Sequence, residues 1–255
     1  MGTVKPAPGV SDSAEDPRER CIREFIATLD EAELTRRYRE DDGLIVLPRL
    51  LPQPLVEEMV AEARRLMSGA TRKWAPFVRK AGAVGHAVIA REAPAMHALH
   101  QSPALMALFE RVTGVPLAHR DPHEAHASAL YTYTRRGDWM DWHYDECGCP
   151  PEISFSTVVG LIDDSSARLE LESRCADPAQ PPLRRSLQTA PGTFAFFCGS
   201  RVRHRVTPLA EGEERVTLAF TYLRKGHRPS GIYNLRMRLG NALIYFGLGS
   251  LFRRR

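Results

Sequence analysis

The second half of the chain is a series of short β-rich segments separated by turn residues, and this pattern constrains the fold more than any other feature. Paired turn residues such as Gly137-Asp138 and Pro191-Gly192 lie between segments that are rich in β-branched and aromatic residues. The predicted strands cover residues 129–134, 153–162, 168–172, 193–197 and 216–222, with a long surface loop predicted over 173–191. Many short strands at this spacing are typical of a β-sandwich or β-barrel.

The first half of the chain has helical periodicity instead. Apolar residues recur at i, i+3, i+4 and i+7 in Ile22, Phe25, Ile26 and Leu29, which is the spacing of one helix face. The predicted helices cover residues 17–40, 54–67 and 94–112, the last divided at Pro103. A short strand is predicted over 44–47. The predicted fold class is therefore α+β, with helices that precede a β core.

Composition divides the chain into three parts. Residues 1–16 contain few apolar side chains and are predicted to be a flexible tail. Residues 17–230 form the predicted domain, and a chain of 255 residues with 43% hydrophobic residues can bury a sizeable core there. Residues 231–255 stand apart, because a mostly apolar run of about 14 residues is followed by three arginines. This last segment is too short to span a bilayer and is expected to dock on the domain, on a second subunit or at a membrane surface.

Charge and cysteine content argue against several classes of protein. The formal net charge is only +4, whereas a nucleic-acid-binding protein usually carries a stronger and clustered basic excess. The chain has five cysteines, an odd number whose spacing suggests no disulfide framework. The first residues contain no apolar run typical of a secretory signal. We therefore expect a cytoplasmic protein with reduced thiols and no nucleic-acid partner.

A metal site is suggested by the segment Trp142-His143-Tyr144-Asp145. In an extended segment residues two apart face the same way, so His143 and Asp145 would point together and Trp142 and Tyr144 would point to the other face. His204, in a later β-rich segment, is the candidate third ligand. Two histidines and one carboxylate leave coordination positions open and suit iron(II), whereas zinc usually takes four ligands and is redox-inert. A pair of polar residues at a strand end remains the alternative for His143 and Asp145.

Arg215 and Thr217 strengthen the metal hypothesis, because they follow His204 by eleven and thirteen residues in a predicted strand. The period of two places both side chains on one face. A guanidinium fork binds a carboxylate through two hydrogen bonds, and a hydroxyl adds a third. These residues therefore predict a binding site for a small organic acid beside the metal, and a salt bridge on the strand face is the alternative for Arg215.

Taken together, the His-x-Asp pair, the later histidine and the Arg-x-Thr pair resemble the 2-oxoglutarate- and iron(II)-dependent oxygenase superfamily. The segment from Pro191 to Thr217 is similar to the second half of prolyl-hydroxylase-like members. The resemblance covers about a third of the chain, from Tyr131 to Leu223.

The resemblance implies a double-stranded β-helix, or jelly roll, flanked by N-terminal helices. It also implies that iron(II) is held by His143, Asp145 and His204, and that O2 and 2-oxoglutarate are co-substrates. Arg215, assisted by Thr217, would bind the distal carboxylate of 2-oxoglutarate, and Tyr131 or Tyr133 would hydrogen-bond the same molecule. Core packing is the alternative for either tyrosine.

The expected reaction is hydroxylation of a small molecule, such as an amino acid or a natural-product intermediate. Related halogenases have Gly or Ala in place of the carboxylate ligand, and this chain has Asp145 there. Desaturation and cyclisation are alternative outcomes of the same chemistry. The alternative functions are a lipid-modifying oxygenase at a membrane surface and a non-catalytic jelly-roll binding module.

The remaining histidines have weaker interpretations. His119, His123 and His126 could form a second metal site, but a polar loop that leads into the β core is the favoured interpretation. His86, His97 and His100 are expected to be surface or helix-packing residues. Cys147-Gly148-Cys149 has no second cysteine pair to support a zinc site, so a tight loop at the site entrance is expected.

Overall fold

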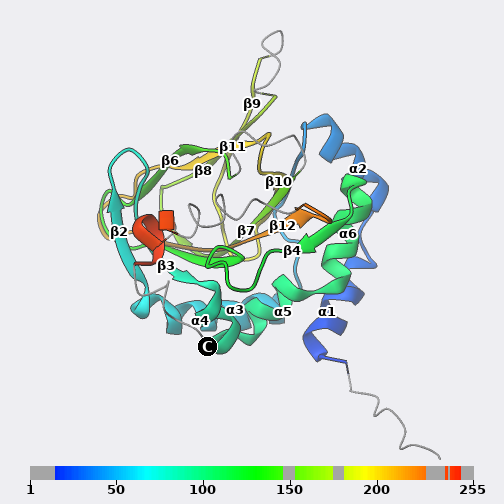
Figure 1. The fold of residues 1–255 in the computed structure, drawn as a ribbon, viewed down its shortest axis with the longest axis horizontal. Coiled ribbons are helices and arrows are strands. Elements are labelled where there is room, and N and C mark those ends of the chain that lie inside the picture. Colours follow the sequence, from blue (N-terminus) through cyan, green and yellow to red (C-terminus); the bar gives the residue numbers. More distant parts are fainter. Residues whose placement is uncertain (1–14, 146–152, 175–180, 228–238, 241, 248–255) are drawn as a thin grey trace, which may run out of the picture.

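The structure is a computed structural model, and it describes residues 15–145, 153–174, 181–227, 239–240 and 242–247. Helices and one rolled sheet make up these residues (Figure 1). The helical elements are α1 (Pro17–Ile26), α2 (Glu31–Glu40), α3 (Gln53–Leu66), the 3-10 turn η1 (Met67–Gly69), α4 (His86–Glu92), α5 (Pro94–Gln101), α6 (Pro103–Thr113) and the π-helical turn η2 (Ala242–Phe246). The strands are β1 (Leu44–Leu47), β2 (Thr71–Ala75), β3 (Arg79–Gly85), β4 (Leu117–His119), β5 (Ser128–Tyr133), β6 (Trp139–His143), β7 (Ser154–Asp164), β8 (Leu169–Ser173), β9 (Leu183–Leu187), β10 (Phe194–Cys198), β11 (Arg203–Val206) and β12 (Glu214–Arg224).

Polar caps set the ends of the helices. The predicted helix over 17–40 is two helices, because the side chain of Asp30 accepts a hydrogen bond from the backbone N–H of Glu33 and begins α2. The predicted division at Pro103 is confirmed. There the hydroxyl of Ser102 accepts from the N–H of Leu105, and proline occupies the first position of α6. Side-chain caps therefore mark where α1, α2 and α6 begin, whereas α3, α4 and α5 begin without one.

The strands form one antiparallel sheet that rolls up on itself, as Figure 1 shows. The hydrogen-bonded order is β1-β10-β7-β12-β5-β3-β6-β11-β8-β9, with β2 on the edge of β3 and β4 on the edge of β12. The larger part of the sheet, β1-β10-β7-β12-β5-β3, joins the smaller part, β6-β11-β8-β9, where β3 pairs with β6. The predicted fold class, a jelly-roll core flanked by N-terminal helices, is confirmed.

Both faces of the larger part of the sheet are buried, and β10 shows why. Phe194 and Phe196 point to the helices and belong to the core that the helices form with the outer face of the sheet. Ala195 and Phe197 alternate with them and belong to a second core inside the roll. An apolar strand without polar alternation is the expected sequence of such a doubly covered strand.

Several further elements differ from the sequence-based prediction, which included neither α4 nor β4. The hairpin β2–β3 was not predicted, and β9 lies within the predicted loop over 173–191. Most β9 side chains are exposed, so its sequence has no buried face that would mark a strand. Residues 175–180 of that predicted loop, and residues 1–14 of the predicted tail, lie outside the described residues.

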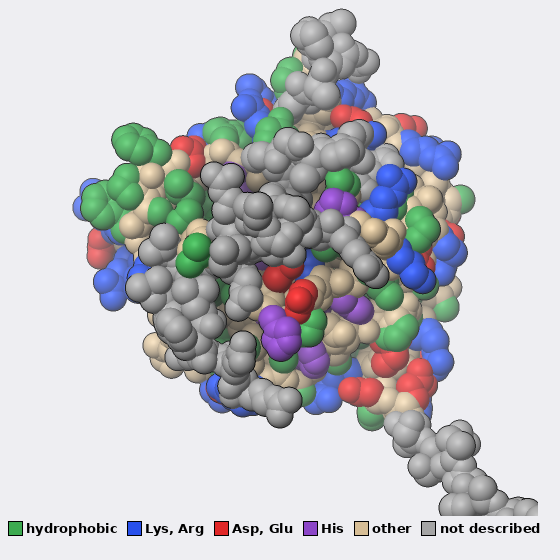
Figure 2. Space-filling model, viewed as in Figure 1, with side chains coloured by type: hydrophobic (Ala, Val, Ile, Leu, Met, Phe, Trp, Pro, Cys, Tyr) green, Lys and Arg blue, Asp and Glu red, His purple; other side chains and the backbone are tan. Residues whose placement is uncertain are grey.

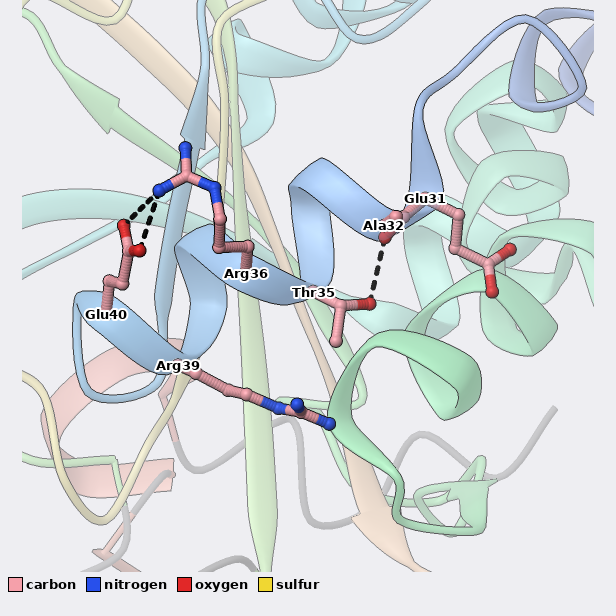
Figure 3. A pocket seen from close by; sticks show the side chains of 6 residues that line it. All are labelled: Glu31, Ala32, Thr35, Arg36, Arg39 and Glu40. Atoms are coloured by element: carbon pink, nitrogen blue, oxygen red, sulfur yellow. Dashed lines mark hydrogen bonds and ion pairs between the residues drawn. The ribbon is translucent and has the colours of Figure 1, made fainter.

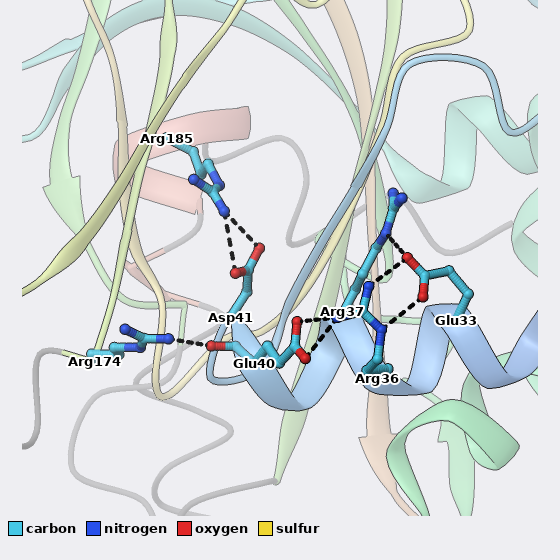
Figure 4. A network of polar contacts seen from close by, with 7 residues as sticks. All are labelled: Glu33, Arg36, Arg37, Glu40, Asp41, Arg174 and Arg185. Atoms are coloured by element: carbon cyan, nitrogen blue, oxygen red, sulfur yellow. Dashed lines mark hydrogen bonds and ion pairs between the residues drawn. The ribbon is translucent and has the colours of Figure 1, made fainter.

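An ion-pair network connects α2 with the β9 region (Figure 4). Arg36 pairs with Glu33 and Glu40 on the helix, and Arg185 of β9 pairs with Asp41 at 3.1 Å. A shallow hollow on the outer face of α2 is lined in part by one of these pairs, Arg36–Glu40 (Figure 3). Exposed ion pairs stabilise a fold only weakly, so this surface contributes little to the position of the candidate site.

Candidate functional site

The structure brings His143, Asp145 and His204 together at the mouth of the roll. His143 ends β6, His204 lies on β11, and the two are cross-strand partners. Nε2 of His143 is 3.6 Å and Nε2 of His204 is 3.8 Å from the same Asp145 oxygen, Oδ1. One ligand atom from each residue lies within 4.8 Å of the other two. Such a group can hold a metal ion with two imidazoles and one carboxylate.

Hydrogen bonds orient the two residues near the end of β6. Nδ1–H of His143 donates to the backbone carbonyl of Asp141 at 2.7 Å, which leaves the lone pair of Nε2 free for a metal. The hydroxyl of Ser156 donates to Oδ2 of Asp145, so that Oδ1 faces the histidines. The backbone N–H of Asp145 donates to the carbonyl of Gly199 at 3.1 Å. A Cβ at Gly199 would lie 3.1 Å from that of Asp145, so glycine permits this close approach.

The electrostatics of the group also suit a divalent cation. Burial lowers the pKa of His204 to about 4, so this imidazole is neutral near pH 7. Burial opposes ionisation of Asp145, but His204, His143 and the Ser156 hydroxyl together hold the pKa of Asp145 below its ordinary value. Neutral imidazole and ionised carboxylate are the forms that bind metals.

The faces of β6 follow the predicted alternation up to its last residue. The Trp142 ring lies away from the ligands, between the guanidinium groups of Arg203 and Arg205. Tyr144 was predicted on the same outer face, but it lines the cavity beside His143. The reason is that β6 ends at His143, so the period of two no longer applies to the residues after it.

Arg215 lies deep in the same cavity as the metal-ligand candidates. It is 1% exposed, and its Nε–H donates to the hydroxyl of Thr189 at 2.9 Å. Its Nη1 and Nη2 groups are buried and have no hydrogen-bond partner in the described part of the chain. Burial lowers the pKa of Arg215, opposed by the nearby Tyr133 and Asp163, and a guanidinium remains charged at any physiological pH. The geometry therefore leaves a cationic fork that can accept an anion.

The other residues predicted for acid binding surround Arg215. Tyr133 is its cross-strand partner on β5, and the guanidinium carbon lies 5.2 Å from the centroid of the tyrosine ring. Thr217 faces Tyr131 across the same pair of strands. All four of these residues line the cavity. Burial raises the pKa of both tyrosines, so both hydroxyls remain protonated and able to donate.

Sequence reasoning missed the residues that hold Arg215 in place. Asp163 accepts hydrogen bonds from both the N–H and the hydroxyl of Thr189, at 2.6 and 2.9 Å, and Thr189 in turn accepts from Arg215. Thr189 reaches this position because its backbone crosses close over Gly160, where a Cβ would meet the Thr189 carbonyl oxygen at 2.1 Å. A glycine inside the apolar strand β7 was the available sequence signal for this close backbone contact.

The cavity above the ligands has a volume of about 330 Å³ and a mixed lining. Arg120 and Glu124 form an ion pair at 3.1 Å in its wall. Nδ1 of His126 lies 3.0 Å from the hydroxyl of Tyr131. In Figure 2, histidine and acidic side chains gather near the middle of the visible face, while basic side chains are scattered around its rim. The cavity can therefore hold a small polar molecule next to the metal-ligand candidates.

The described part of the C-terminal segment docks on the domain. Turn η2 packs against β2 and β3, and its Tyr245 ring lies 4.4 Å from the guanidinium carbon of the fully buried Arg79. Ile244 and Tyr245 line the cavity. Among the described residues, the helices are all too short or too polar to cross a bilayer. The contact between Tyr245 and Arg79 was not predicted, because these residues are far apart in the sequence and meet only in the folded chain.

The histidines with weaker sequence-based interpretations fall into different parts of the structure. His119, His123 and His126 do not meet: His123 is exposed, His126 lines the cavity, and His119 lies beside His100 in the helix-facing core. His86, His97 and His100 come together instead, within the packing of α4 and α5. Cys147-Gly148-Cys149 lies outside the described residues. Cys21 and Cys198, which are described, are free thiols.

Comparison with known proteins identifies the fold. The epimerase SnoN from nogalamycin biosynthesis, described as non-heme and alpha-ketoglutarate dependent, is 22% identical with a TM-score of 0.64, over 80% of this chain and 86% of that one. AviO1 from Streptomyces viridochromogenes is 19% identical with a TM-score of 0.62, over 80% and 99%. A prolyl-4-hydroxylase from Pseudomonas putida is 18% identical with a TM-score of 0.57, over 78% and 100%. The chain has the fold of the 2-oxoglutarate- and iron(II)-dependent oxygenases.

Sequence comparison adds one family match. Residues 27–148 match the family model described as Halogenase D, just under half of the chain. The match includes His143 and Asp145 and ends before His204 and Arg215. No curated protein matches this sequence. The structural neighbours therefore identify the fold, whereas the candidate site is identified from the geometry of its own residues.

Proposed function

We propose that this chain is a 2-oxoglutarate- and iron(II)-dependent dioxygenase. The observation that carries the proposal is the buried Arg215, whose two Nη groups have no partner among the described residues and lie in the same cavity as the metal-ligand candidates. Buried guanidinium N–H groups without hydrogen-bond partners are unfavourable, whereas a carboxylate would satisfy both groups at once. A small dicarboxylic 2-oxo acid, held at one end by Arg215 and at the other by the metal, fits this arrangement.

The donor set fits iron(II). His143, Asp145 and His204 would hold the ion, Arg215 and Thr217 would bind the distal carboxylate of 2-oxoglutarate, and Tyr133 would contact the same molecule. When bound, iron(II), 2-oxoglutarate and O2 together supply the oxidising chemistry, and the protein supplies position and shelter from water. The two imidazoles and one carboxylate leave coordination positions for the co-substrates.

The surrounding residues hold the donors in position. The Asp141 carbonyl fixes the tautomer of His143, and the Ser156 hydroxyl fixes the orientation of the Asp145 carboxylate. Tyr245 and Ile244 line the cavity from the C-terminal segment and limit the access of water. The burial of Arg215 also strengthens its interaction with a bound carboxylate, because few water molecules screen it.

We propose that the substrate is a small molecule, such as an amino acid or a natural-product intermediate. The cavity volume of about 330 Å³ suits a ligand of this size. The Arg120–Glu124 ion pair in the wall offers both a cation and an anion to a polar substrate. The free thiols of Cys21 and Cys198 agree with a reducing cytoplasmic location.

Hydroxylation is the outcome that we propose, and Asp145 supports it over halogenation. Its carboxylate faces both histidines and receives the Ser156 hydrogen bond, so it fills the position that a halide would need. The Halogenase D match ends at residue 148 and includes this aspartate. Among the structural neighbours, SnoN is described as an epimerase and SnoK as a carbocyclase, so oxidation without net hydroxylation is the main alternative outcome.

Two other functions have less support. A lipid-modifying role at a membrane would use the C-terminal segment, but the described part of that segment packs against β2 and β3 and lines the cavity. A non-catalytic binding module would not need three converging metal-ligand candidates beside a buried arginine. Both alternatives predict that the chain does not turn over 2-oxoglutarate with a small polar substrate.

The decisive experiment measures succinate. The purified chain is incubated with iron(II), ascorbate, O2 and 2-oxoglutarate, with and without a panel of amino acids and small natural products. His143→Ala provides the blank, and Arg224→Gln, an exposed change at the end of β12, is the matched control that should retain full activity. Mass spectrometry of the products distinguishes an added oxygen atom from an added chlorine. Succinate that never exceeds the His143→Ala blank would overturn the enzyme assignment.

A further inference from the structure

A second group of histidines lies in the core between the helices and the sheet, outside the cavity. His86 begins α4, and His97 and His100 lie one turn apart on α5. One nitrogen from each of these three residues lies within 4.8 Å of the others. His100 packs on Phe220 and Tyr222, which belong to the helix-facing core. We call His86, His97 and His100 the helix-side cluster.

The helices and the strand around the cluster bring the imidazole rings close to one another. Positions i and i+3 of a helix share one face, so His97 and His100 project together from α5. The centroid of the His86 ring lies 5.8 Å from that of His97 and 5.4 Å from that of His100. His119, at the end of β4, lies on another side with its centroid 5.1 Å from that of His100. Helices α4 and α5 therefore direct three imidazoles to one place, and β4 brings a fourth beside them.

Several nitrogens of these rings are buried without a partner. Nδ1 of His97, Nε2 of His100 and Nδ1 of His119 have no hydrogen-bond partner within the described ranges, and His100 is only 1% exposed. Buried polar atoms are normally hydrogen-bonded, and an unpaired one is unfavourable. Unpaired nitrogens on both α5 histidines of the cluster, and on His119 beside His100, therefore indicate that something outside the described protein atoms satisfies them.

The opposite nitrogens of two of the rings already have partners of the kind that support metal ligands. Nδ1 of His86 lies 2.8 Å from the hydroxyl of Ser128. Nδ1 of His100 lies 3.2 Å from the side-chain amide of Gln101. The amide of glutamine can rotate to offer its oxygen, and Nδ1–H of His100 would then donate to it. In that state Nε2 of His100 presents a lone pair toward the cluster.

We propose that His86, His97 and His100 form a second metal site, which binds Zn²⁺. The group contains three imidazoles and no carboxylate, a donor set that suits zinc rather than the iron(II) of the cavity. His119 or a water molecule completes the coordination. Tetrahedral zinc has Zn–N bonds of about 2.0–2.1 Å, so the nitrogens need to approach by at most about 1.5 Å. The bound ion fastens α4 to α5 where they pack on the sheet.

The test uses a chain whose iron site has been removed. The full-length His143→Ala/His204→Ala variant is treated with chelator and titrated with Co²⁺, whose tetrahedral complexes absorb visible light, and with Zn²⁺ against a metal indicator. One equivalent should bind. Adding His97→Ala, the most accessible change in the cluster, should weaken binding by more than about 100-fold. Adding His123→Ala, an exposed histidine on a nearby turn, should leave the affinity unchanged.

Thermal unfolding of the same variants separates metal binding from folding. Zinc should raise the midpoint of the parent variant and of the His123→Ala variant, because a ligand that binds only the folded state stabilises it. It should leave the midpoint of the folded His97→Ala variant unchanged. Circular dichroism without metal verifies that His97→Ala folds, and His97→Gln serves in its place if it does not. No bound equivalent in the parent variant, or equal affinity in the His97 variants, overturns the proposal whatever the succinate assay shows.

Discussion

Two groups of histidines lie in the same β-sheet protein and differ in what accompanies them. At the mouth of the roll, His143 and His204 face the carboxylate of Asp145 and an open cavity that ends at Arg215. On the helix side, His86, His97 and His100 meet among packed apolar and aromatic residues. The first group has a charged ligand and space for substrates, and the second has neither.

The difference explains why one group is proposed for catalysis and the other for structure. A carboxylate ligand with open positions keeps a redox-active ion accessible to co-substrates, whereas three imidazoles among packed apolar side chains hold a redox-inert ion away from the substrate cavity. The residues that hydrogen-bond to the ligand side chains also differ between the two sites. Ser156 and Asp141 orient the cavity ligands, while Ser128 and Gln101 lie beside the helix-side rings. The variants below test each distinguishing feature in turn.

The largest effect is expected from removing the Asp145 carboxylate, because this charged ligand is what distinguishes the cavity site from the helix-side cluster. Asp145→Gly leaves two imidazoles and one fewer negative charge, so iron(II) affinity should fall by more than about 100-fold and hydroxylation should cease. Equilibrium iron binding and succinate release measure the two effects, with Arg224→Gln as the control. Hydroxylation that persists in Asp145→Gly at saturating iron would contradict the proposed role. A chlorinated product in the presence of chloride would show that the cavity can also direct halogen transfer.

Removing the cation at the other end of the cavity should have the next largest effect. Arg215→Ala deletes the cation proposed to bind the distal carboxylate and leaves only the Thr217 hydroxyl there, so 2-oxoglutarate binding should weaken by about 2–5 kcal/mol. Calorimetric titration of the iron-loaded protein with 2-oxoglutarate measures this directly. Arg215→Lys should recover part of the loss, because it restores the charge but not the fork. An unchanged 2-oxoglutarate affinity in Arg215→Ala would rule the assignment out.

A smaller effect, on the stability of the fold, is expected from disturbing the close backbone contact between Gly160 and Thr189. In Gly160→Ala the new Cβ would lie 2.1 Å from the Thr189 carbonyl oxygen and 2.4 Å from that of Ala190, and backbone atoms must move to relieve this. The free energy of unfolding in urea should fall by about 1–3 kcal/mol. Gly69→Ala is the matched control, because a Cβ there would meet nothing within 4 Å. If both variants were equally stable, the contact over Gly160 would not constrain Thr189.

Much of the fold could be predicted from the sequence, because its signals are local. The helical spacing of Ile22 and Ile26, the proline that divides the helices and the apolar run of β10 all act within a few residues. The hairpin β2–β3 was missed, since the pairing of β3 with β5 and not its own composition makes it a strand. The strand β9 was missed for a similar reason, as its side chains are mostly exposed.

The site shows the same division between local and tertiary information. The period of two correctly placed His143 opposite Trp142, and it placed Arg215 with Thr217. It could not show that Tyr133 pairs directly with Arg215, because strand register depends on the whole sheet. The helix-side cluster was missed, since its members come from two helices and only the spacing of His97 and His100 is local.

The smallest expected effect is on the orientation of the cavity carboxylate. In Ser156→Ala, Oδ2 of Asp145 loses its hydrogen-bond donor but remains in the same pocket, so iron(II) affinity should fall by about tenfold. Ser68→Ala, an exposed change within η1, is the control. The helix-side cluster supplies the contrast, because zinc binding there should be the same in Ser156→Ala and in the wild-type chain. A matching loss of zinc affinity would show that the two metal sites are coupled through the sheet, and the proposed separation of their roles would then be wrong.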